Sequence, residues 1–248
     1  MRFPAPAGTD PAYWEPDTAT IEAYQNADLT LLNGAGYEKW LERASLPPSR
    51  LVNTSASFEK DYIPLKGAVT HSHGPEGEHT HGGFASTIWL DPQLAQKQAN
   101  SICDALVRLL PERRVIFEQN FQSLAADLAG LDAELARITA DWKTPLLASH
   151  PVYQYLERRY RLHLTSFHWE PDEMPAESEW RRLERTLRTH RTRWMLWEAA
   201  PSGEIAARLA KCNVAAVVFD PCASAPLSGD YLTVMRENIK RLRSAFAQ

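Results

Sequence analysis

Short apolar runs alternate with helical patterns along most of the chain. In the first part, Asp17 caps a predicted helix over residues 18–27, and brief apolar segments follow at residues 29–32 and 51–53, each bounded by turn residues. A helical pattern over residues 37–44 lies between them. Short apolar runs of this kind are typical of buried strands in a parallel sheet. The order of strand, turn and helix therefore predicts an α/β fold.

The middle of the chain has the longest helical pattern. One helix is predicted from Pro92 to Leu110, where Pro111 interrupts it, and a second runs to about Trp142 with apolar residues at three- and four-residue steps. At about 1.5 Å per residue the second helix exceeds 40 Å, which is longer than a small lobe is wide. We expect it to act as a rigid linker between two lobes.

The last hundred residues repeat the α/β pattern. We therefore expect α/β lobes at residues 1–111 and 143–248, parallel sheets in both, and the linker helix at 112–142. The predicted strands are residues 146–148, 164–167, 194–197 and 214–219, and the predicted helices are 152–160, 180–190, 203–211 and 229–248.

Residues 71–83 form a histidine-rich segment that has no apolar periodicity and contains several glycines. We expect it to be an irregular, mobile loop. Imidazole and carboxylate groups are the usual ligands of zinc and its neighbours, so the composition indicates metal contact. A solvated stretch, or a tether that scavenges metal loosely, is the alternative interpretation. The candidate ligands are His71, His73, His79 and His81, interleaved with Glu76 and Glu78.

Two further candidate ligands follow predicted strands. His150 comes after the strand at 146–148, and Asp220 comes after the strand at 214–219. Ligands of α/β proteins bind at the carboxyl ends of strands, so these two side chains converge if their strands are neighbours in one sheet. A capping or core role for His150 and a simple turn at Asp220 are the alternatives.

Composition excludes several classes of protein. The net charge is −4, and the arginines at 181–182 and 188–193 lie on a predicted helix as an ordinary solvated face, which argues against nucleic acid as the partner. No apolar run has the roughly 20 residues needed to span a bilayer, and the start has no secretion signal pattern. The three cysteines lack metal-site spacing and are expected to be free thiols.

Several motifs spread over nearly the whole chain resemble one family. They are DPAYWEP at 10–16, DLTLLNGAGYEKW at 28–40, WLDP at 89–92, HPVYQY at 150–155, Asp220, and DYLTVMREN at 230–238, together with the histidine-rich segment. With these motifs the chain resembles the zinc- and manganese-type periplasmic solute-binding proteins of ABC transporters. The resemblance implies two lobes that hold the ion between them and a permease that receives it.

The resemblance carries over only two of four ligand positions. His150 and Asp220 match, whereas Ala12 and Thr87 stand where the family has histidines. Because a closed zinc site normally needs four donors, or three and a water, other groups must complete it. We expect His81 or His79, together with His71 or His73, to supply the missing nitrogens. Glu15 and Cys222 are weaker candidates.

The sequence therefore predicts a monomeric, non-enzymatic zinc receptor in the periplasm, with a permease as partner and no nucleic acid. Zinc is favoured over manganese because His150 is a nitrogen donor. A zinc-dependent hydrolase with Glu198 or Glu15 as general base is one alternative, although the chain has no H-E-x-x-H pair. An accessory metal chaperone or an adhesin-like binding protein is another.

Overall fold

Two units divide the computed structural model, residues Met1–Leu128 and Ala129–Gln248. The structure describes residues 3, 5–6, 14–65, 69–72, 78–81 and 83–246, and for 69–72 and 78–81 it describes the backbone alone. The boundary between the units falls inside helix α3 (Arg114–Thr139), which is one continuous helix. Within the described ranges, no helix is both long and apolar enough to cross a membrane.

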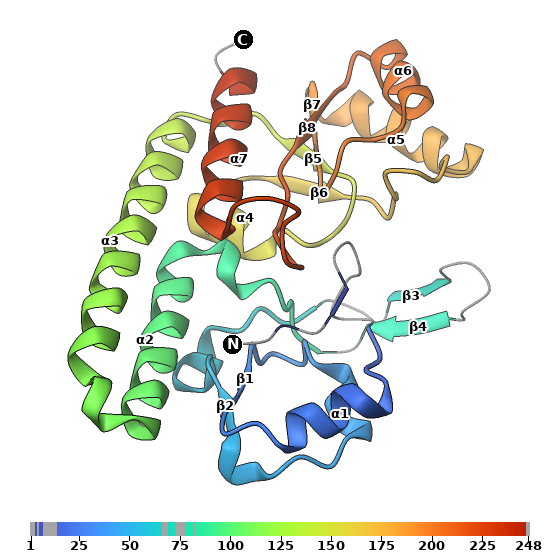
Figure 1. Ribbon diagram of the computed structural model, residues 1–248. Coiled ribbons are helices and arrows are strands. Elements are labelled where there is room, and N and C mark those ends of the chain that lie inside the picture. Colours follow the sequence, from blue (N-terminus) through green and yellow to red (C-terminus); the bar gives the residue numbers. More distant parts are fainter. Residues whose placement is uncertain are drawn as a thin grey trace. The chain divides into compact units, whose positions relative to one another are not determined.

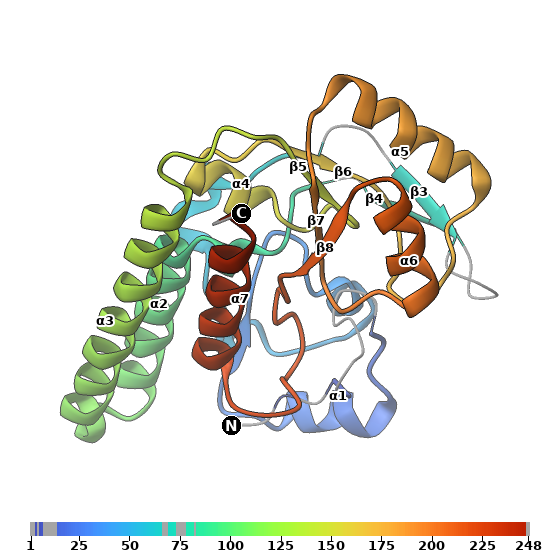
Figure 2. The same ribbon diagram turned by 90° about the horizontal axis from the view of Figure 1, so that it is seen from above.

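Unit 1 is built on a two-stranded parallel sheet, β1 (Thr30–Leu32) beside β2 (Leu51–Asn53), as the sequence predicts. Helix α1 (Thr18–Gln25) precedes the sheet, and the Asp17 carboxylate caps it by accepting a hydrogen bond from Thr20 N–H at 2.8 Å. Helix α2 (Pro92–Leu109) follows a second aspartate cap, Asp91, and in Figures 1 and 2 it runs beside the first half of α3. Short 3₁₀ helices complete the described part of the unit: η1 (Lys39–Arg43), η2 (Pro48–Arg50), η3 (Ala56–Asp61), η5 (Ile88–Leu90) and η6 (Pro111–Arg113).

Two predictions for unit 1 need correction. The helix expected at 37–44 is the five-residue 3₁₀ helix η1, and the turn that leads to it has a positive φ of 72° at Gly36. The histidine-rich segment is not irregular throughout, because β3 (Val69–Ser72) and β4 (Glu78–His81) pair as an antiparallel hairpin. Apolar periodicity did not reveal this hairpin, since a strand pair held by backbone hydrogen bonds does not require a buried face.

Unit 2 contains a four-stranded parallel sheet with the strand order β6-β5-β7-β8. Helices cover both faces, with α5 and α6 on one side and α4 and α7 on the other (Figures 1 and 2). This confirms the α/β class predicted from the sequence. The elements are β5 (Leu146–Ala148), α4 (Gln154–Tyr160), β6 (Leu164–Ser166), α5 (Glu177–Thr189), β7 (Trp194–Trp197), α6 (Gly203–Lys211), β8 (Ala215–Val218) and α7 (Tyr231–Phe246).

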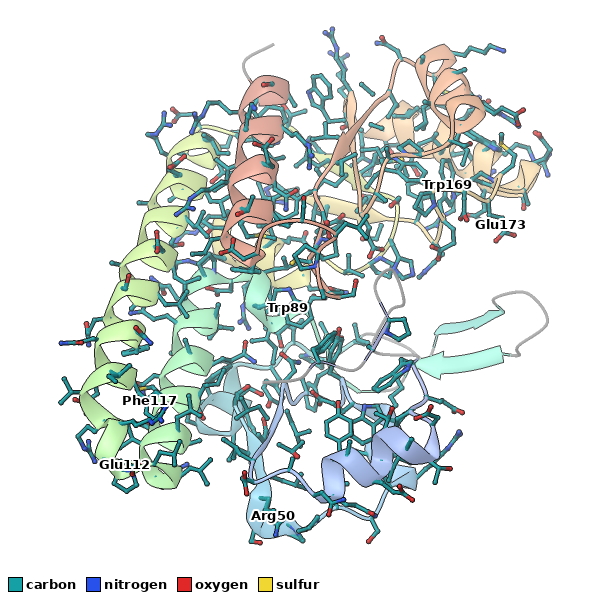
Figure 3. All side chains as sticks on the ribbon, in the orientation of Figure 1. Arg50, Trp89, Glu112, Phe117, Trp169 and Glu173 are labelled. Carbon is teal, nitrogen blue, oxygen red and sulfur yellow. The ribbon has the colours of Figure 1, made fainter. Side chains whose placement is uncertain are left out.

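The core of unit 2 lies between the sheet and helices α5 and α6. Trp169, labelled in Figure 3, stacks at a tilt on Trp180 of α5 with ring centroids 4.7 Å apart. Burial of such large rings removes much apolar surface from water and fixes the helices against the sheet. The sheet can therefore present its carboxyl edge on a rigid support. The buried cluster comprises Leu147, Phe167, Trp169, Trp180, Leu183, Met195, Trp197, Ile205, Leu209 and Val214.

Candidate metal-binding site

An ionisable side chain follows every strand of the unit 2 sheet at its carboxyl edge. His168 follows β6, His150 follows β5, Glu198 follows β7 and Asp220 follows β8, and all four are partly buried. Because parallel strands end at the same edge, the strand order sets the order of these groups across the edge. The edge therefore offers two imidazoles and two carboxylates side by side.

The direction of chain progression reverses between β5 and β7. From β5 the chain crosses through α4 to β6 on one side, and it then returns through α5 to β7 on the other side of β5. Open α/β sheets bind ligands outside the strand ends at such a switch point, because the crossover helices leave a crevice there. His150 and Glu198 flank this point.

His150 is held by Glu198. Its Nδ1 lies 3.0 Å from Glu198 Oε1, so Nδ1–H donates to the carboxylate. This contact keeps the proton on Nδ1 and makes Nε2 the ring nitrogen that can bind a metal. The His168 ring also meets the His150 ring edge-to-face, with centroids 5.7 Å apart. Glu198 therefore fixes the orientation of the His150 ring.

The backbone of Asp220 is clamped by one buried amide. The Oδ1 of Asn238 accepts a hydrogen bond from Asp220 N–H at 3.0 Å, and the Nδ2 of Asn238 donates to the Asp220 carbonyl at 2.7 Å. Asn238 is fully buried on α7. The Asp220 Oδ1 accepts from Cys222 N–H at 2.7 Å, and within the described residues its second carboxylate oxygen accepts no hydrogen bond. The clamp fixes the backbone of Asp220, and the hydrogen bond from Cys222 N–H orients its carboxylate.

Tyr153 joins the segment after β5 to the segment after β8. Its hydroxyl donates to the Phe219 carbonyl at 2.8 Å, one residue before Asp220. Burial of the ring, together with the charges of Glu198 and Asp220, raises the pKa of Tyr153 well above its usual value. The phenol therefore keeps its proton and remains a hydrogen-bond donor at neutral pH.

His150 and Asp220 lie at the same edge but not on neighbouring strands. The sequence interpretation required neighbours for convergence, whereas β7 lies between β5 and β8. Two strand spacings of about 4.8 Å can be bridged by an imidazole and a carboxylate, each adding a metal bond of about 2 Å. Across the described ranges, no group of three or more His, Cys, Asp and Glu side chains is placed to hold a metal ion. The edge by itself supplies an incomplete site.

The histidine-rich candidates are described only in part. His71, His79 and His81 lie in the β3–β4 hairpin, where His71 is opposite His79, and His73 lies outside the described residues. Their contribution to a metal site stays a prediction.

The remaining sequence candidates differ in their surroundings. Ala12 lies outside the described residues, and Thr87 is 6% exposed. Glu15 forms an ion pair with Arg43 on an exposed surface. Burial, and next the charges of Asp220 and Asp230, raise the pKa of the Cys222 thiol to about 11, so the thiol is protonated at neutral pH and is a poor donor beside imidazole. All three cysteines are free, as expected.

Sequence reasoning missed His168, Tyr153 and Asn238, and it named Glu198 only as the general base of an alternative hydrolase, not as the partner of His150. His168 and Glu198 follow their strands at offsets similar to those of His150 and Asp220, and that repeated offset was a usable signal. Tyr153 and Asn238 gave no such signal, because each supports Asp220 from a distant part of the chain.

The corresponding edge of unit 1 is a network of neutral polar groups. Gln98 Nε2 donates to Asn33 Oδ1 at 2.9 Å and to Thr54 Oγ1 at 3.1 Å, and Ser55 Oγ donates to the Asn33 carbonyl at 2.5 Å. Glu38 closes the turn after β1, where Oε1 accepts from Asn33 N–H at 2.6 Å. The groups at this edge bind one another rather than presenting donors to a ligand.

An open parallel sheet with imidazole and carboxylate groups at its switch point defines a candidate metal-ion-binding α/β protein. Comparison with known families agrees with that class. The chain belongs to the ZnuA family, described as the periplasmic component A of a zinc-uptake complex, which matches residues 4–245.

Individual relatives support the family and the fold. The zinc-binding protein AdcA of Streptococcus pyogenes serotype M6 is 25% identical over 96% of this chain, and the high-affinity zinc uptake system protein ZnuA of Bacillus subtilis is 28% identical over 83%. The Zn(II)-bound ZnuA-like domain of Streptococcus pneumoniae AdcA has the same fold, with a TM-score of 0.79 at 22% identity over 98% of this chain and 88% of that domain. The chain spans 50% of the length of the S. pyogenes protein and 66% of the B. subtilis protein.

Proposed function

We propose that this chain is a zinc receptor that captures the ion between two lobes in the periplasm and delivers it to the permease of an ABC transporter. Membership of the ZnuA family and the zinc-binding names of its relatives support the class of ligand. The observation that carries the proposal is the contact between Glu198 and His150, because a carboxylate on Nδ1 prepares Nε2 as a metal donor at the switch point.

His150 and Asp220 are the proposed ligands from unit 2. His150 supplies nitrogen, which suits zinc better than manganese, and Asp220 supplies one carboxylate oxygen. The Asn238 clamp and the Tyr153 hydrogen bond support this assignment, because metal ligands are commonly oriented by buried hydrogen-bonding partners.

The histidine-rich segment is proposed to complete the coordination sphere. Two donors hold zinc poorly, and the positions of Ala12 and Thr87 supply none. His81 or His79, with His71 or His73, are the proposed sources of the missing nitrogens. Gly74, Gly77, Gly82 and Gly83 are close to them in sequence, and glycine permits the backbone conformations with which a segment can fold around an ion.

Calorimetric titration of the 248-residue chain tests the proposal. We expect one zinc ion per chain, bound more tightly than manganese, with affinity falling as the pH is lowered because protonated imidazole cannot bind a metal. No zinc binding, or an affinity that does not change between about pH 7.5 and 5.5, would contradict histidine ligation.

A four-residue variant tests the loop separately. Replacing His71, His73, His79 and His81 by alanine should weaken zinc binding by orders of magnitude. An unchanged affinity would remove the loop from the site while leaving His150 and Asp220 as ligands.

A further inference from the structure

Helix α5 carries a row of arginines on its exposed face. Arg181, Arg185 and Arg188 are spaced four and three residues apart, so they lie on one side of the helix, and all three are exposed. Exposed Arg191 and Arg193 follow directly in the connection to β7. We call these five residues the arginine row.

The row is not needed to hold the helix in place. Trp180 and Leu183 anchor α5 in the core, with exposed fractions of 1% and 0%. Arg208 of α6 braces the helix with two hydrogen bonds to Glu177, at 2.6 and 2.7 Å, and its guanidinium lies 4.3 Å from the Trp180 ring centroid. The basic contacts that support the fold are thus made by other arginines.

Arg182 lies on the same helix as the row and, unlike the row, forms contacts that support the fold. It donates to Glu179 at 3.2 Å and to the Ser166 carbonyl at 3.1 Å, and it lies over the Phe167 ring. In the part of the chain that the structure describes, no member of the arginine row forms an ion pair or a hydrogen bond of this kind. The row therefore keeps its charge available at the surface.

The acidic residues beside the row are fewer than its five arginines. Exposed Glu177 and Glu184 each lie four residues before an arginine of the row, and the charge of Glu177 interacts with Arg181. Glu177 also accepts two hydrogen bonds from Arg208, and the charge of Glu184 also acts on Arg208 and Cys212. Like charges three and four positions apart on a helix repel, so the row costs helix stability. The whole chain has a net charge of −4, so the positive charge of the row is concentrated in one place on an acidic protein. Such a local concentration of positive charge orients a molecule toward an anionic partner.

We propose that the arginine row docks unit 2 on anionic phospholipid headgroups. Guanidinium groups bind phosphate in a bidentate manner, and an anionic leaflet attracts clustered basic residues without any apolar contact. A protein partner is less favoured, because protein interfaces need a buried apolar centre and the other exposed residues of this face are polar or charged: Glu177, Ser178, Glu184 and Thr189. The proposal rests on the proposed function only in placing the chain beside a membrane.

Vesicle co-sedimentation with the full chain tests the docking. The probe is phosphatidylcholine vesicles with and without about 30 mol% phosphatidylglycerol, at low salt and at about 0.5 M salt. The wild-type chain should bind only the anionic vesicles and should dissociate at high salt. Equal binding to both vesicle types, or no binding to either, overturns the proposal.

Matched variants assign the binding to the row. Arg181→Gln, Arg185→Gln and Arg188→Gln together should lower the partition coefficient on the order of a hundredfold, since each basic residue near an anionic surface contributes about fivefold. Lysine at the same three positions should retain most of the binding. The control triple, Arg108→Gln, Arg113→Gln and Arg137→Gln, changes the net charge equally at exposed positions elsewhere and should bind nearly as wild type.

The outcomes separate this proposal from the zinc proposal. If the row variant and the control triple lose equal binding, attraction is by net charge alone and the row has no special role. If wild-type chain ignores lipid but binds reconstituted permease through the row, a protein partner replaces the lipid. The triple glutamine variant of the row should bind zinc with the same affinity as wild type in calorimetry. The lipid result and the zinc result are therefore independent, so either proposal can fail without the other.

Discussion

The two sheets of this protein use the same structural position in opposite ways. In unit 1, the residues after β1 and β2 are Asn33, Thr54 and Ser55, which hydrogen-bond to one another and to Gln98. In unit 2, the residues after the strands are imidazoles and carboxylates. The comparison teaches that the chemistry of a strand end depends on the residue types there: neutral amides and hydroxyls close a turn, whereas imidazoles and carboxylates are candidate metal ligands.

Support from behind the edge also differs. At unit 2, Glu198 accepts from the inner nitrogen of His150, Asn238 binds the backbone of Asp220, and Tyr153 donates to the carbonyl of the neighbouring Phe219. At unit 1, Glu38 is used on backbone N–H groups of the turn itself. The carboxyl edge of the unit 2 sheet carries candidate donors, whereas the carboxyl edge of the unit 1 sheet stabilises a turn.

The largest expected effect is the loss of the imidazole at the unit 2 edge. His150→Ala should weaken zinc binding by more than about a hundredfold, since even residues that only orient a ligand are worth 10- to 100-fold. Calorimetric titration measures this effect. His163→Ala, at an exposed histidine just before β6, is the matched control and should leave the affinity unchanged. Similar losses in both variants would contradict a ligand role for His150.

The turn of unit 1 can be broken by a single methyl group. Gly34 has a φ of +87°, and a Cβ there would overlap Ser55 Oγ and Asn53 Oδ1. Gly34→Ala should therefore lower the free energy of unfolding by about 3 kcal/mol. Gly36→Ala, at a φ of +72° with open space around it, should cost only about 1 kcal/mol from backbone strain. Urea denaturation compares them, and equal costs would show that the packed network is not what constrains Gly34.

The clamp on Asp220 gives an intermediate effect. Asn238→Leu removes both hydrogen bonds to the Asp220 backbone and should weaken zinc binding between about 10- and 100-fold. The same change made in an Asp220→Ala background should have little further effect on zinc affinity, because the clamp acts through Asp220. If the losses of zinc affinity from Asn238→Leu and Asp220→Ala were instead additive, Asn238 would support the fold as a whole and would not act through Asp220.

The smallest expected effect concerns Glu38 and pH. Burial raises the pKa of this carboxyl above its usual value, although the backbone hydrogen bonds from Asn33 and Gly34 oppose the shift. A raised pKa in the folded state means that the contribution of Glu38 to stability is fully present below the unfolded pKa of 4.5 and is lost as pH rises through the folded pKa. The unfolding free energy of wild type relative to Glu38→Gln should therefore decline with rising pH and then level off. Denaturation curves from about pH 4 to 8 measure it, and a rise with pH would reverse the assigned cause.

Most of the elements followed from local sequence. The strands at 30–32, 51–53, 146–148 and 194–197 lie where the apolar runs are, and Asp17 and Asp91 cap the helices that follow them. The 3₁₀ helix at Lys39–Arg43 and the histidine-rich hairpin were not predicted. In both, backbone hydrogen bonds rather than an apolar stripe set the conformation, and a pattern of side chains does not report those bonds.

The sequence by itself determined the α/β class, the approximate positions of most helices and the two candidate donors His150 and Asp220, because strand ends and caps are local properties of the chain. Only the tertiary structure decided that β7 lies between β5 and β8, that Glu198 holds His150, and that Asn238 holds Asp220. These relations join residues 18 to 48 positions apart through the packing of whole helices and strands. A local sequence pattern does not predict the hydrogen-bond partner of a buried amide or carboxylate, because that partner is set by the tertiary packing of the core.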